Sequence, residues 1–218
     1  AMIQYRNQWM GLEGSPATLM GSVEHSLAND RVGLGLTLGR ESIGIDARTD
    51  MSANFAYRIP ISKGNLAGGI RVGFSHYISD FTKLQNVQIG DPLHESNNNQ
   101  FSIFSSGFGL YYNEQRFFIG LTMPAVAALS NKDKSSFKAR HLYFHTGGMM
   151  GPESNLINVE PSLLVSYQKA APIQYTLGLN VWYNRQFAIG AHLRSGDAFA
   201  LSTEMFLMDR LRMSLSYD

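Results

Sequence analysis

The sequence contains no cysteine and little charge. Zero Cys in 218 residues excludes a disulfide scaffold, a thiolate metal site and a cysteine nucleophile. Asp, Glu, Lys and Arg together make up 16% of the chain, below the roughly 25% of an ordinary soluble domain. The 18 basic and 17 acidic residues leave a formal net charge of +1. We therefore expect no attraction to nucleic acid and no nucleic-acid partner.

Long apolar runs are also missing, although 44% of the residues are hydrophobic. No run reaches the roughly 18 consecutive apolar residues of a membrane-spanning helix. The sequence shows no signal peptide and opens directly in an apparent strand, so we expect a mature or trimmed product. A chain with little charge and no long apolar run must arrange its apolar residues in a pattern, and that pattern indicates the fold class.

The pattern is an alternation of apolar and small or polar residues along most of the chain. It predicts about 13 strands, several near the roughly 9 to 11 residues with which a tilted strand crosses a bilayer. The alternation is clearest in residues 32–38, 50–59, 66–78, 175–183, 187–194 and 211–217. Weaker versions occupy residues 3–9, 18–27, 100–112, 117–123, 141–149, 158–167 and 199–207.

The connections between these segments differ between the two ends of the strands. Odd-numbered connections are expected at residues 10–17, 39–47, 79–99, 124–140, 169–172 and 195–197. Even-numbered ones are expected at residues 29–30, 60–65, 113–116, 150–155, 184–186 and 208–210. The first four odd connections are longer than every even one, as in outer-membrane barrels, whose long loops are extracellular. This places the first residue at the periplasmic rim.

The sequence therefore predicts an all-β fold, an antiparallel up-and-down transmembrane β-barrel, as one domain over residues 1–218. Single-chain bacterial barrels have even strand numbers, so we expect 14 strands in the intact protein, with the closing C-terminal strand outside this sequence. The localisation that follows is the outer membrane of a Gram-negative bacterium.

The composition of the two strand faces predicts which one meets lipid. A soluble all-β domain, the alternative, would turn its apolar face inward and cover the other face with long charged side chains. Here the face opposite the apolar one is mostly Gly, Ser, Ala, Thr and Asn, with sparse charges of both signs, while lysines gather in turns. Tyrosines near strand ends suit an interfacial girdle: Tyr57, Tyr77, Tyr112, Tyr167, Tyr175, Tyr183 and Tyr217. We therefore expect the apolar face to contact lipid.

The histidines are the first candidates for chemistry. His141 and His145 are four residues apart, which on a strand separates them by roughly 13 Å, too far to share one metal ion. His25 and His76 fall on the presumed lipid face, where some barrels hydrolyse lipids, but no serine and acidic partner can be assigned to either from sequence. We therefore expect no catalytic, cofactor-binding or metal-binding residues and no enzyme activity.

The N-terminal segment is more specific. Residues 6–9 read Arg-Asn-Gln-Trp, and residues 14–18 contain a Gly-x-Pro-x-Thr string. This segment closely resembles the PorP/SprF family, outer-membrane proteins of the type IX secretion system of Bacteroidota. Further similar strings follow in the family's order over nearly the whole chain: Gly-Leu-Gly-Leu at 33–36, Tyr-Arg-Ile at 57–59, Gly-Asp-Pro at 90–92 and Ser-Tyr-Asp at 216–218. A family segment with Asn-Pro-Ala and the sequence after Tyr-Asp are missing, in line with trimmed ends.

The resemblance implies a non-enzymatic secretion component that supports export or surface display of cargo such as gliding adhesins. Its implied partners are outer-membrane lipid, other type IX components and secreted cargo. A barrel of about 14 strands is too narrow to pass a folded protein, so we expect docking of cargo or periplasmic machinery. The alternatives are a transporter for a small solute and, less favoured, a lipid hydrolase.

Two groups of candidate residues follow from the resemblance. The family motif is expected to lock the first strand in place or to recognise a partner, with the structural role favoured: Arg6, Asn7, Gln8, Trp9, Gly14, Pro16 and Thr18. The loops at 79–99 and 124–140 are the expected outer contact surfaces. The candidate contacts in the first of these loops are Asp91, Pro92 and His94.

Overall fold

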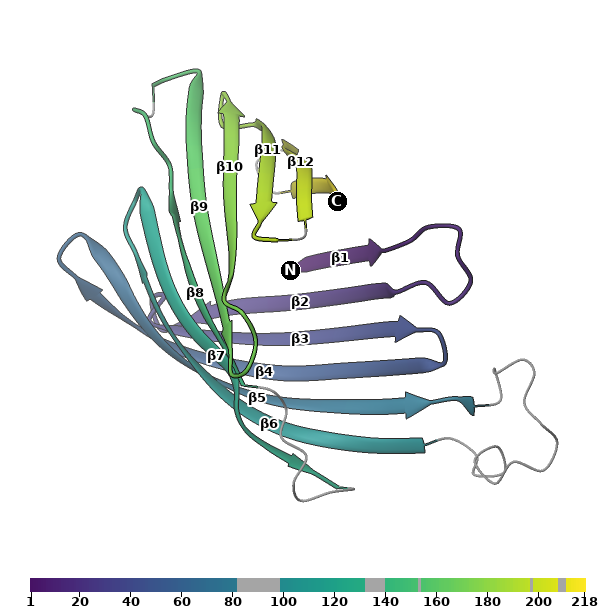
Figure 1. Cartoon of the computed structure of the whole chain (residues 1–218). Coiled ribbons are helices and arrows are strands. Elements are labelled where there is room, and N and C mark those ends of the chain that lie inside the picture. Colours follow the sequence, from purple (N-terminus) through teal and green to yellow (C-terminus); the bar gives the residue numbers. More distant parts are fainter. Residues whose placement is uncertain (82–98, 132–139, 153, 197, 208–210) are drawn as a thin grey trace, which may run out of the picture. The chain divides into compact units, whose positions relative to one another are not determined.

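The computed structural model describes residues 1–81, 99–131, 140–152, 154–196, 198–207 and 211–218. Thirteen antiparallel strands follow one another in sequence order within one sheet (Figure 1), which confirms the predicted all-β, up-and-down architecture. No helix in this part of the chain is long and apolar enough to cross a membrane. The strands are β1 (Met2–Asn7), β2 (Ala17–Leu27), β3 (Val32–Ile43), β4 (Asp46–Ile61), β5 (Gly64–Ser79), β6 (Asn99–Asn113), β7 (Phe117–Ser130), β8 (His141–Gly148), β9 (Ile157–Gln168), β10 (Gln174–Tyr183), β11 (Phe187–Arg194), β12 (Ala198–Leu207) and β13 (Leu211–Tyr217).

Contacts between residues divide the chain into two compact units. Unit 1 comprises Ala1–Arg58, Gly69–Phe108 and Ala125–Lys138, and unit 2 comprises Ile59–Gly68, Gly109–Pro124 and Ala139–Asp218. Strands β4 to β7 contribute residues to both units. The side-chain clusters that define the candidate site lie within one unit each.

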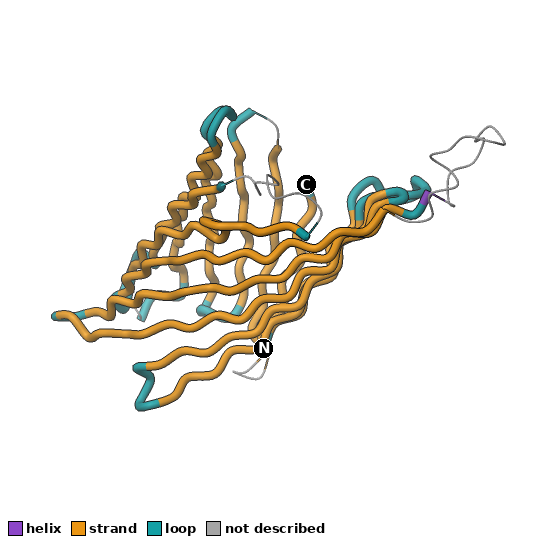
Figure 2. The backbone as a smooth tube through the Cα atoms, turned by 90° about the horizontal axis from the view of Figure 1, so that it is seen from below, coloured by secondary structure: helices purple, strands orange, loops and turns teal. Residues whose placement is uncertain are grey.

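Tight turns join many of the strands (Figure 2). In the β2–β3 turn, Asn29 and Asp30 have positive φ angles of 54° and 64°, a conformation that Asn and Asp tolerate better than most residues. The Ser26 hydroxyl donates a hydrogen bond of 2.5 Å to the Asp30 carboxylate, and the Arg58 guanidinium donates one of 3.0 Å to the Asp30 carbonyl. Local side-chain chemistry therefore fixes this turn.

The predicted loop at residues 39–47 is wrong. β3 continues to Ile43 and β4 begins at Asp46, so only residues 44–45 form the turn. Glu41 pairs in register with Arg48, and their side chains lie 4.0 Å apart. Glu41 and Arg48 are therefore inward-facing strand residues that compensate each other across the strand pair.

The lengths of two further connections also differ from the prediction. β7 runs through Pro124 to Ser130, which shortens the loop expected at residues 124–140. β8 ends at Gly148, and the β8–β9 connection occupies residues 149–156. The first four odd connections therefore do not all exceed the even ones. The three longest connections, at residues 8–16, 80–98 and 131–140, nevertheless follow odd-numbered strands and share one rim.

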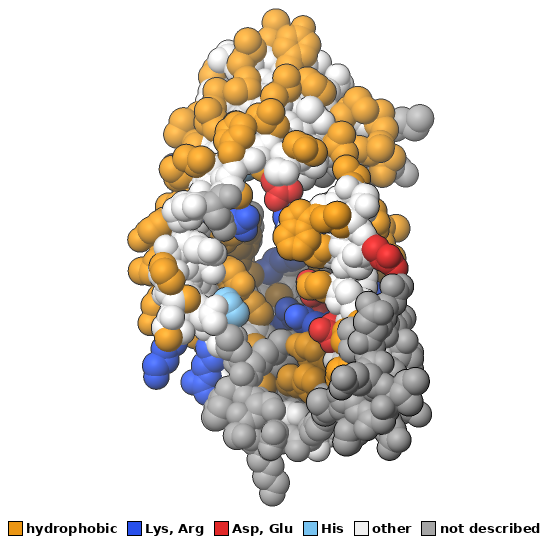
Figure 3. Space-filling model, turned by 45° about the vertical axis from the view of Figure 1, so that its right-hand side comes forward, with side chains coloured by type: hydrophobic (Ala, Val, Ile, Leu, Met, Phe, Trp, Pro, Cys, Tyr) orange, Lys and Arg blue, Asp and Glu red, His pale blue; other side chains and the backbone are white. Residues whose placement is uncertain are grey.

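Burial is inverted relative to a soluble protein. Large apolar side chains on one face of the strands are exposed, as with Leu36 at 64%, and hydrophobic side chains cover much of the surface seen in Figure 3. The largest fully buried side chains are polar: Asn158 at 1% and Ser75 at 2% exposure. A soluble domain buries its large apolar side chains instead. The large apolar side chains therefore lie on the outward face, the face that contacts hydrocarbon in outer-membrane barrels.

This orientation predicts a depth-dependent response to charge. Leu36 lies midway along the outward face of β3, whereas Leu27 is the last residue of β2, beside a turn. We expect Leu36→Arg to lower the free energy of unfolding in lipid vesicles by about 2–4 kcal/mol, and Leu27→Arg by about 1 kcal/mol or less. Guanidinium titration of the vesicle-inserted protein measures both. Equal losses for the two variants would contradict the assignment of the outward face.

Candidate functional site

The apolar wall of unit 1 ends in a row of polar residues. On β3 and β4, Leu38 pairs with Met51, and the next outward pair toward the 44–45 turn is Arg40 with Thr49. On β5 and β6, the rings of Phe74 and Phe104 lie 4.9 Å apart, and the next outward pair is His76 with Ser102. A change from apolar to polar residues at the same level on neighbouring strands marks the level at which hydrocarbon gives way to headgroups.

The His76–Ser102 contact bears on the hydrolase alternative. His76 Nδ1 lies 2.9 Å from Ser102 Oγ on the outward face. Sequence could not pair the two residues, because a long connection separates β5 from β6 and hides their register. Hydrolysis through a serine also requires an orienting acid and oxyanion donors, which this hydrogen bond does not supply. The His76–Ser102 hydrogen bond therefore does no more than pair two polar side chains at the end of the apolar face.

The outward tyrosines lie near strand ends, with one correction. Tyr77 is wrongly predicted as a girdle residue, because it shares the inward face of β5 with buried Ser75. Its ring stacks on Phe101 at 4.6 Å and lies under the Arg48 guanidinium, 5.5 Å from it. Alternation with the outward His76 already places Tyr77 on the inward face, whereas its nearness to the strand end suggested the girdle. Exposed tyrosines at the other predicted positions are Tyr57, Tyr167, Tyr175, Tyr183 and Tyr217.

A charged cluster occupies the interior of unit 1. Arg48 Nε lies 2.7 Å from Asp50 Oδ2 in an ion pair, and Arg48 Nη2 donates a hydrogen bond of 3.0 Å to Asp50 Oδ1. Ser75 Oγ on β5 donates to Asp50 Oδ1 at 2.5 Å. Glu41 on β3 completes the compensation of Arg48 at 4.0 Å. The cluster thus connects three successive strands, β4 to β5 by a charge-assisted hydrogen bond and β3 to β4 by an ion pair.

A second cluster, of different composition, occupies the interior of unit 2. Trp182 Nε1 on β10 donates a hydrogen bond of 2.7 Å to Glu160 Oε2 on β9. Arg212 on β13 lies 5.6 Å from the Trp182 ring, a cation–π contact, and pairs with Glu204 on β12. Ala188 of β11, which pairs in register with Trp182, is fully buried. The small side chain of Ala188 leaves room for the indole between the strands.

Glycines in unit 2 make room for polar side chains. A Cβ atom at Gly178 would lie 2.5 Å from Ser162 Oγ and 2.7 Å from His192 Nδ1. His192 Nε2 in turn lies 3.0 Å from Ser202 Oγ. A larger residue at position 178 would displace this polar layer, so the many glycines opposite the apolar face are a packing requirement of a crowded interior.

The family motif lies at the start of the sheet and holds the β1–β2 loop. Gln8 N–H donates to the Pro16 carbonyl at 2.9 Å, and Ser15 Oγ lies 3.4 Å from Asn7 Oδ1. Gly14 adopts φ +75°, and its carbonyl accepts a 2.9 Å hydrogen bond from the Gly44 amide of the next hairpin. Arg6 and Thr18 pair in register. The structure thus brings all of the motif except Trp9 into the base of one loop.

The tip of this loop is apolar and exposed. Trp9, Met10 and Leu12 are 69%, 74% and 65% exposed. The tip has an internal frame, because Leu12 N–H donates to the Trp9 carbonyl and Ser15 N–H to the Leu12 carbonyl, both at 3.2 Å. The family resemblance singled out Trp9 but not Met10 and Leu12, since exposure in a loop has no sequence period.

The remaining candidate residues, in the 79–99 loop and among the histidines of β8, do not form a site in the described part of the chain. Asp91, Pro92 and His94 lie outside the described residues. Across the described ranges, no group of three or more His, Cys, Asp or Glu residues is placed to hold a metal ion. On β8, His145 packs edge-on against Phe118 at 4.7 Å, and His141 stacks on Tyr143 at 5.9 Å.

An antiparallel all-β chain with an apolar outer wall and a charged, polar interior is an integral outer-membrane protein of the β-barrel class. The family model described as "Type IX secretion system membrane protein PorP/SprF" matches residues 1–218. The chain therefore belongs to the PorP/SprF family of outer-membrane components of type IX secretion, which confirms the resemblance seen in its motifs. No curated protein matches the chain.

The Trp182–Glu160 contact predicts a stability effect. Trp182→Phe keeps a ring for Arg212 but removes the 2.7 Å donor to Glu160 Oε2 and leaves that oxygen with the Asn180 amide at 3.5 Å. We expect the free energy of unfolding to fall by about 1.5–3 kcal/mol, the contribution of a hydrogen bond to a charged group. Trp9→Phe, on the exposed loop, serves as the control and should change it by about 0.5 kcal/mol or less. A Trp182→Phe variant as stable as wild type would show that the bond contributes nothing.

Proposed function

We propose that this chain is a non-enzymatic component of the type IX secretion system that supports export or surface display of cargo, such as gliding adhesins, by docking cargo or periplasmic machinery. We further propose that residues 1–218 form a single barrel domain. Family membership supports the secretion role, and the apolar wall supports the outer-membrane location.

The charged interior favours docking over conduction. Arg48 with Asp50 and Glu41, and Arg212 with Glu204, tie neighbouring strands together inside their own units. Side chains that bind one another across strands fill the interior instead of lining an open path. They also break up any same-sign track, which a solute transporter would use to guide its substrate. The pairing thus favours a scaffold over a conduit or a transporter.

The tip of the β1–β2 loop is the surface best suited to docking, and it is the observation that carries the proposal. Three large apolar side chains, Trp9, Met10 and Leu12, project from a hydrogen-bonded frame at the rim of the longest connections. That rim is extracellular in outer-membrane barrels. An exposed aromatic anchor with apolar neighbours is the usual centre of a protein–protein contact. We assign the remaining motif residues a structural role, holding the loop in shape.

The test replaces the apolar tip without changing its backbone. Trp9 has φ +54°, so Trp9→Asn suits that conformation, and Met10→Ser and Leu12→Ser complete the variant. Because truncating an interface anchor costs about 2 kcal/mol or more, we expect surface cargo to fall by about tenfold or more in cells carrying the triple variant. Antibody labelling of intact cells measures surface cargo, and cross-linking identifies the lost partner.

Leu156→Ser is the matched control, because Leu156 is an exposed apolar residue in a connection on the opposite rim. It should leave surface cargo unchanged. Unchanged cargo in the triple variant would overturn the docking role of the loop. Unchanged cargo after deletion of the whole gene would overturn the secretion role itself.

A further inference from the structure

The outward wall of unit 2 contains a furrow of about 460 Å³, on the scale of small-molecule pockets. Its floor consists of outward-facing small residues, Thr146 and Gly148 on β8 and Pro161 on β9. Phe117, Leu163 and Leu177 form its sides. Arg116, in the turn that precedes β7, and Met150 also line it. The furrow is therefore an apolar depression in the lipid-facing wall that reaches a basic residue at the rim.

The furrow results from the residue types at two positions, Pro161 and Gly148. Proline has no N–H to donate to a neighbouring strand, and the regular pairing of β8 with β9 ends at Gly147 and Ser162, next to Pro161. The chain then rejoins β9 through a bridge between Met150 and Val159, with hydrogen bonds of 2.7 and 3.2 Å. At Gly148 a Cβ atom would collide with the Arg116 carbonyl, so no side chain fills the depression.

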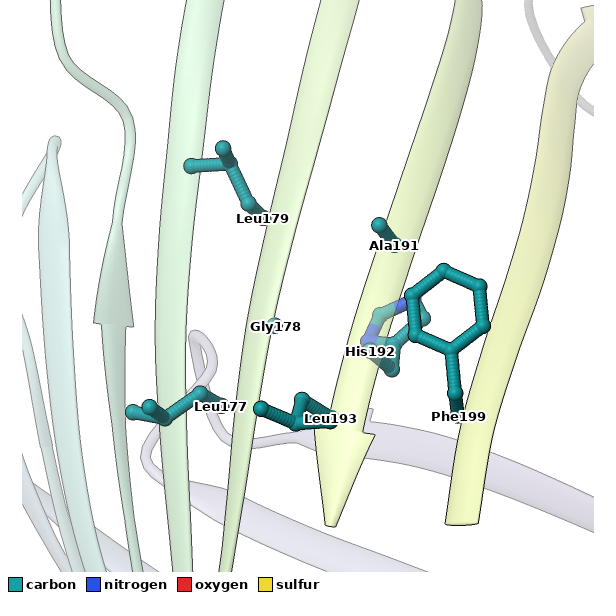
Figure 4. Close-up of a pocket in the computed structure, with 7 residues that line it drawn as sticks. All are labelled: Leu177, Gly178, Leu179, Ala191, His192, Leu193 and Phe199. Carbon is teal, nitrogen blue, oxygen red and sulfur yellow. The ribbon is translucent and has the colours of Figure 1, made fainter.

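A second depression on the same unit provides a comparison. It measures about 190 Å³. Ala191, whose side chain is short, lines it together with Leu179, Leu193 and Phe199 (Figure 4). Lys and Arg are absent from its lining. It is an ordinary irregularity of the wall, which a mobile acyl chain of the bilayer fills without specificity. The larger furrow differs by its size and by Arg116.

The chemistry of the larger furrow points to one ligand. Since the wall faces hydrocarbon, the occupant of its apolar length is an acyl chain. Arg116 belongs to the rim of tight turns, the periplasmic rim in outer-membrane barrels, where phospholipid phosphates lie. The tight turns of unit 2 on this rim repeat the basic character, with Lys63 and Arg185. The acidic neighbour, Glu114, accepts a 3.0 Å hydrogen bond from the Tyr112 hydroxyl.

We propose that this furrow is a binding site for one glycerophospholipid of the periplasmic leaflet, with an acyl chain along Thr146, Gly148 and Pro161 and the phosphate on Arg116. Guanidinium is the side chain best suited to phosphate, because its planar donors bind two oxygens at once. The site lies in unit 2, whereas the docking loop lies in unit 1. The lipid site therefore does not depend on the proposed secretion contact.

The experiment is native mass spectrometry of the full chain, purified in detergent and titrated with palmitoyl-oleoyl phosphatidylglycerol. Wild type should retain one lipid. Arg116→Gln removes the charge and should weaken retention by about tenfold, the effect of one charge-assisted hydrogen bond. Thr146→Phe fills the floor of the furrow and should weaken retention by a similar factor, because the bulkier side chain excludes the acyl chain. Arg116→Lys, which keeps a point charge, should restore part of the loss.

Two matched controls separate a site from the general lipid coat. Arg31→Gln removes a basic residue from another tight turn, and Thr203→Phe enlarges an outward threonine on β12; both should retain lipid like wild type. Mobility of unheated samples in detergent gels verifies that each variant is folded. Equal retention by Arg116→Gln and Arg31→Gln would overturn the proposal. So would equal retention of palmitoyl-oleoyl glycerol, which has the same chains and no phosphate.

Discussion

Every part of this structure depends on the cost of placing a backbone amide or carbonyl in hydrocarbon without a hydrogen-bond partner. Each unsatisfied group costs several kcal/mol, so a β-sheet in a membrane must pair its strands edge to edge. Pairing in sequence order satisfies this demand with the shortest connections. Once the backbone is satisfied within the sheet, the alternation of side chains decides which face contacts lipid and which lies inside.

The interior follows from that choice. Residues inside are mostly small and polar, and in the two charged clusters arginines are compensated across strands, as Arg48 is by Glu41 and Arg212 by Glu204. Compensation matters because removing one partner leaves a charge in a crowded, poorly hydrated space. The same crowding explains why polar side chains lie over glycine, as Ser162 and His192 do at Gly178. Interior polarity is thus a packed network that holds neighbouring strands in register.

Alternation made the strands and the outward apolar face predictable from sequence, and the motif strings at residues 6–9 and 14–18 made the family predictable. Other features depend on information that alternation does not contain. The pairing of Glu41 with Arg48 exists only across a strand pair, so the sequence did not show it. The contacts of His76 with Ser102 and of Tyr77 with Phe101 depend on a register set across a long connection. The two-residue period of a strand predicts which face each side chain lies on, whereas contacts between neighbouring strands are known only from the structure.

The departures from alternation are the informative places in a wall that is otherwise uniform. Most outward positions need only be apolar, so their exact identity says little about function. Pro161 and Gly148 interrupt the wall where a larger residue would seal it, and Trp9, Met10 and Leu12 expose apolar surface beyond the strands, where no lipid tail covers it. Neither feature is needed to satisfy the backbone or to cover the sheet with hydrocarbon. Both depart from what membrane insertion alone requires, and for that reason they are the places where a binding role has physical support.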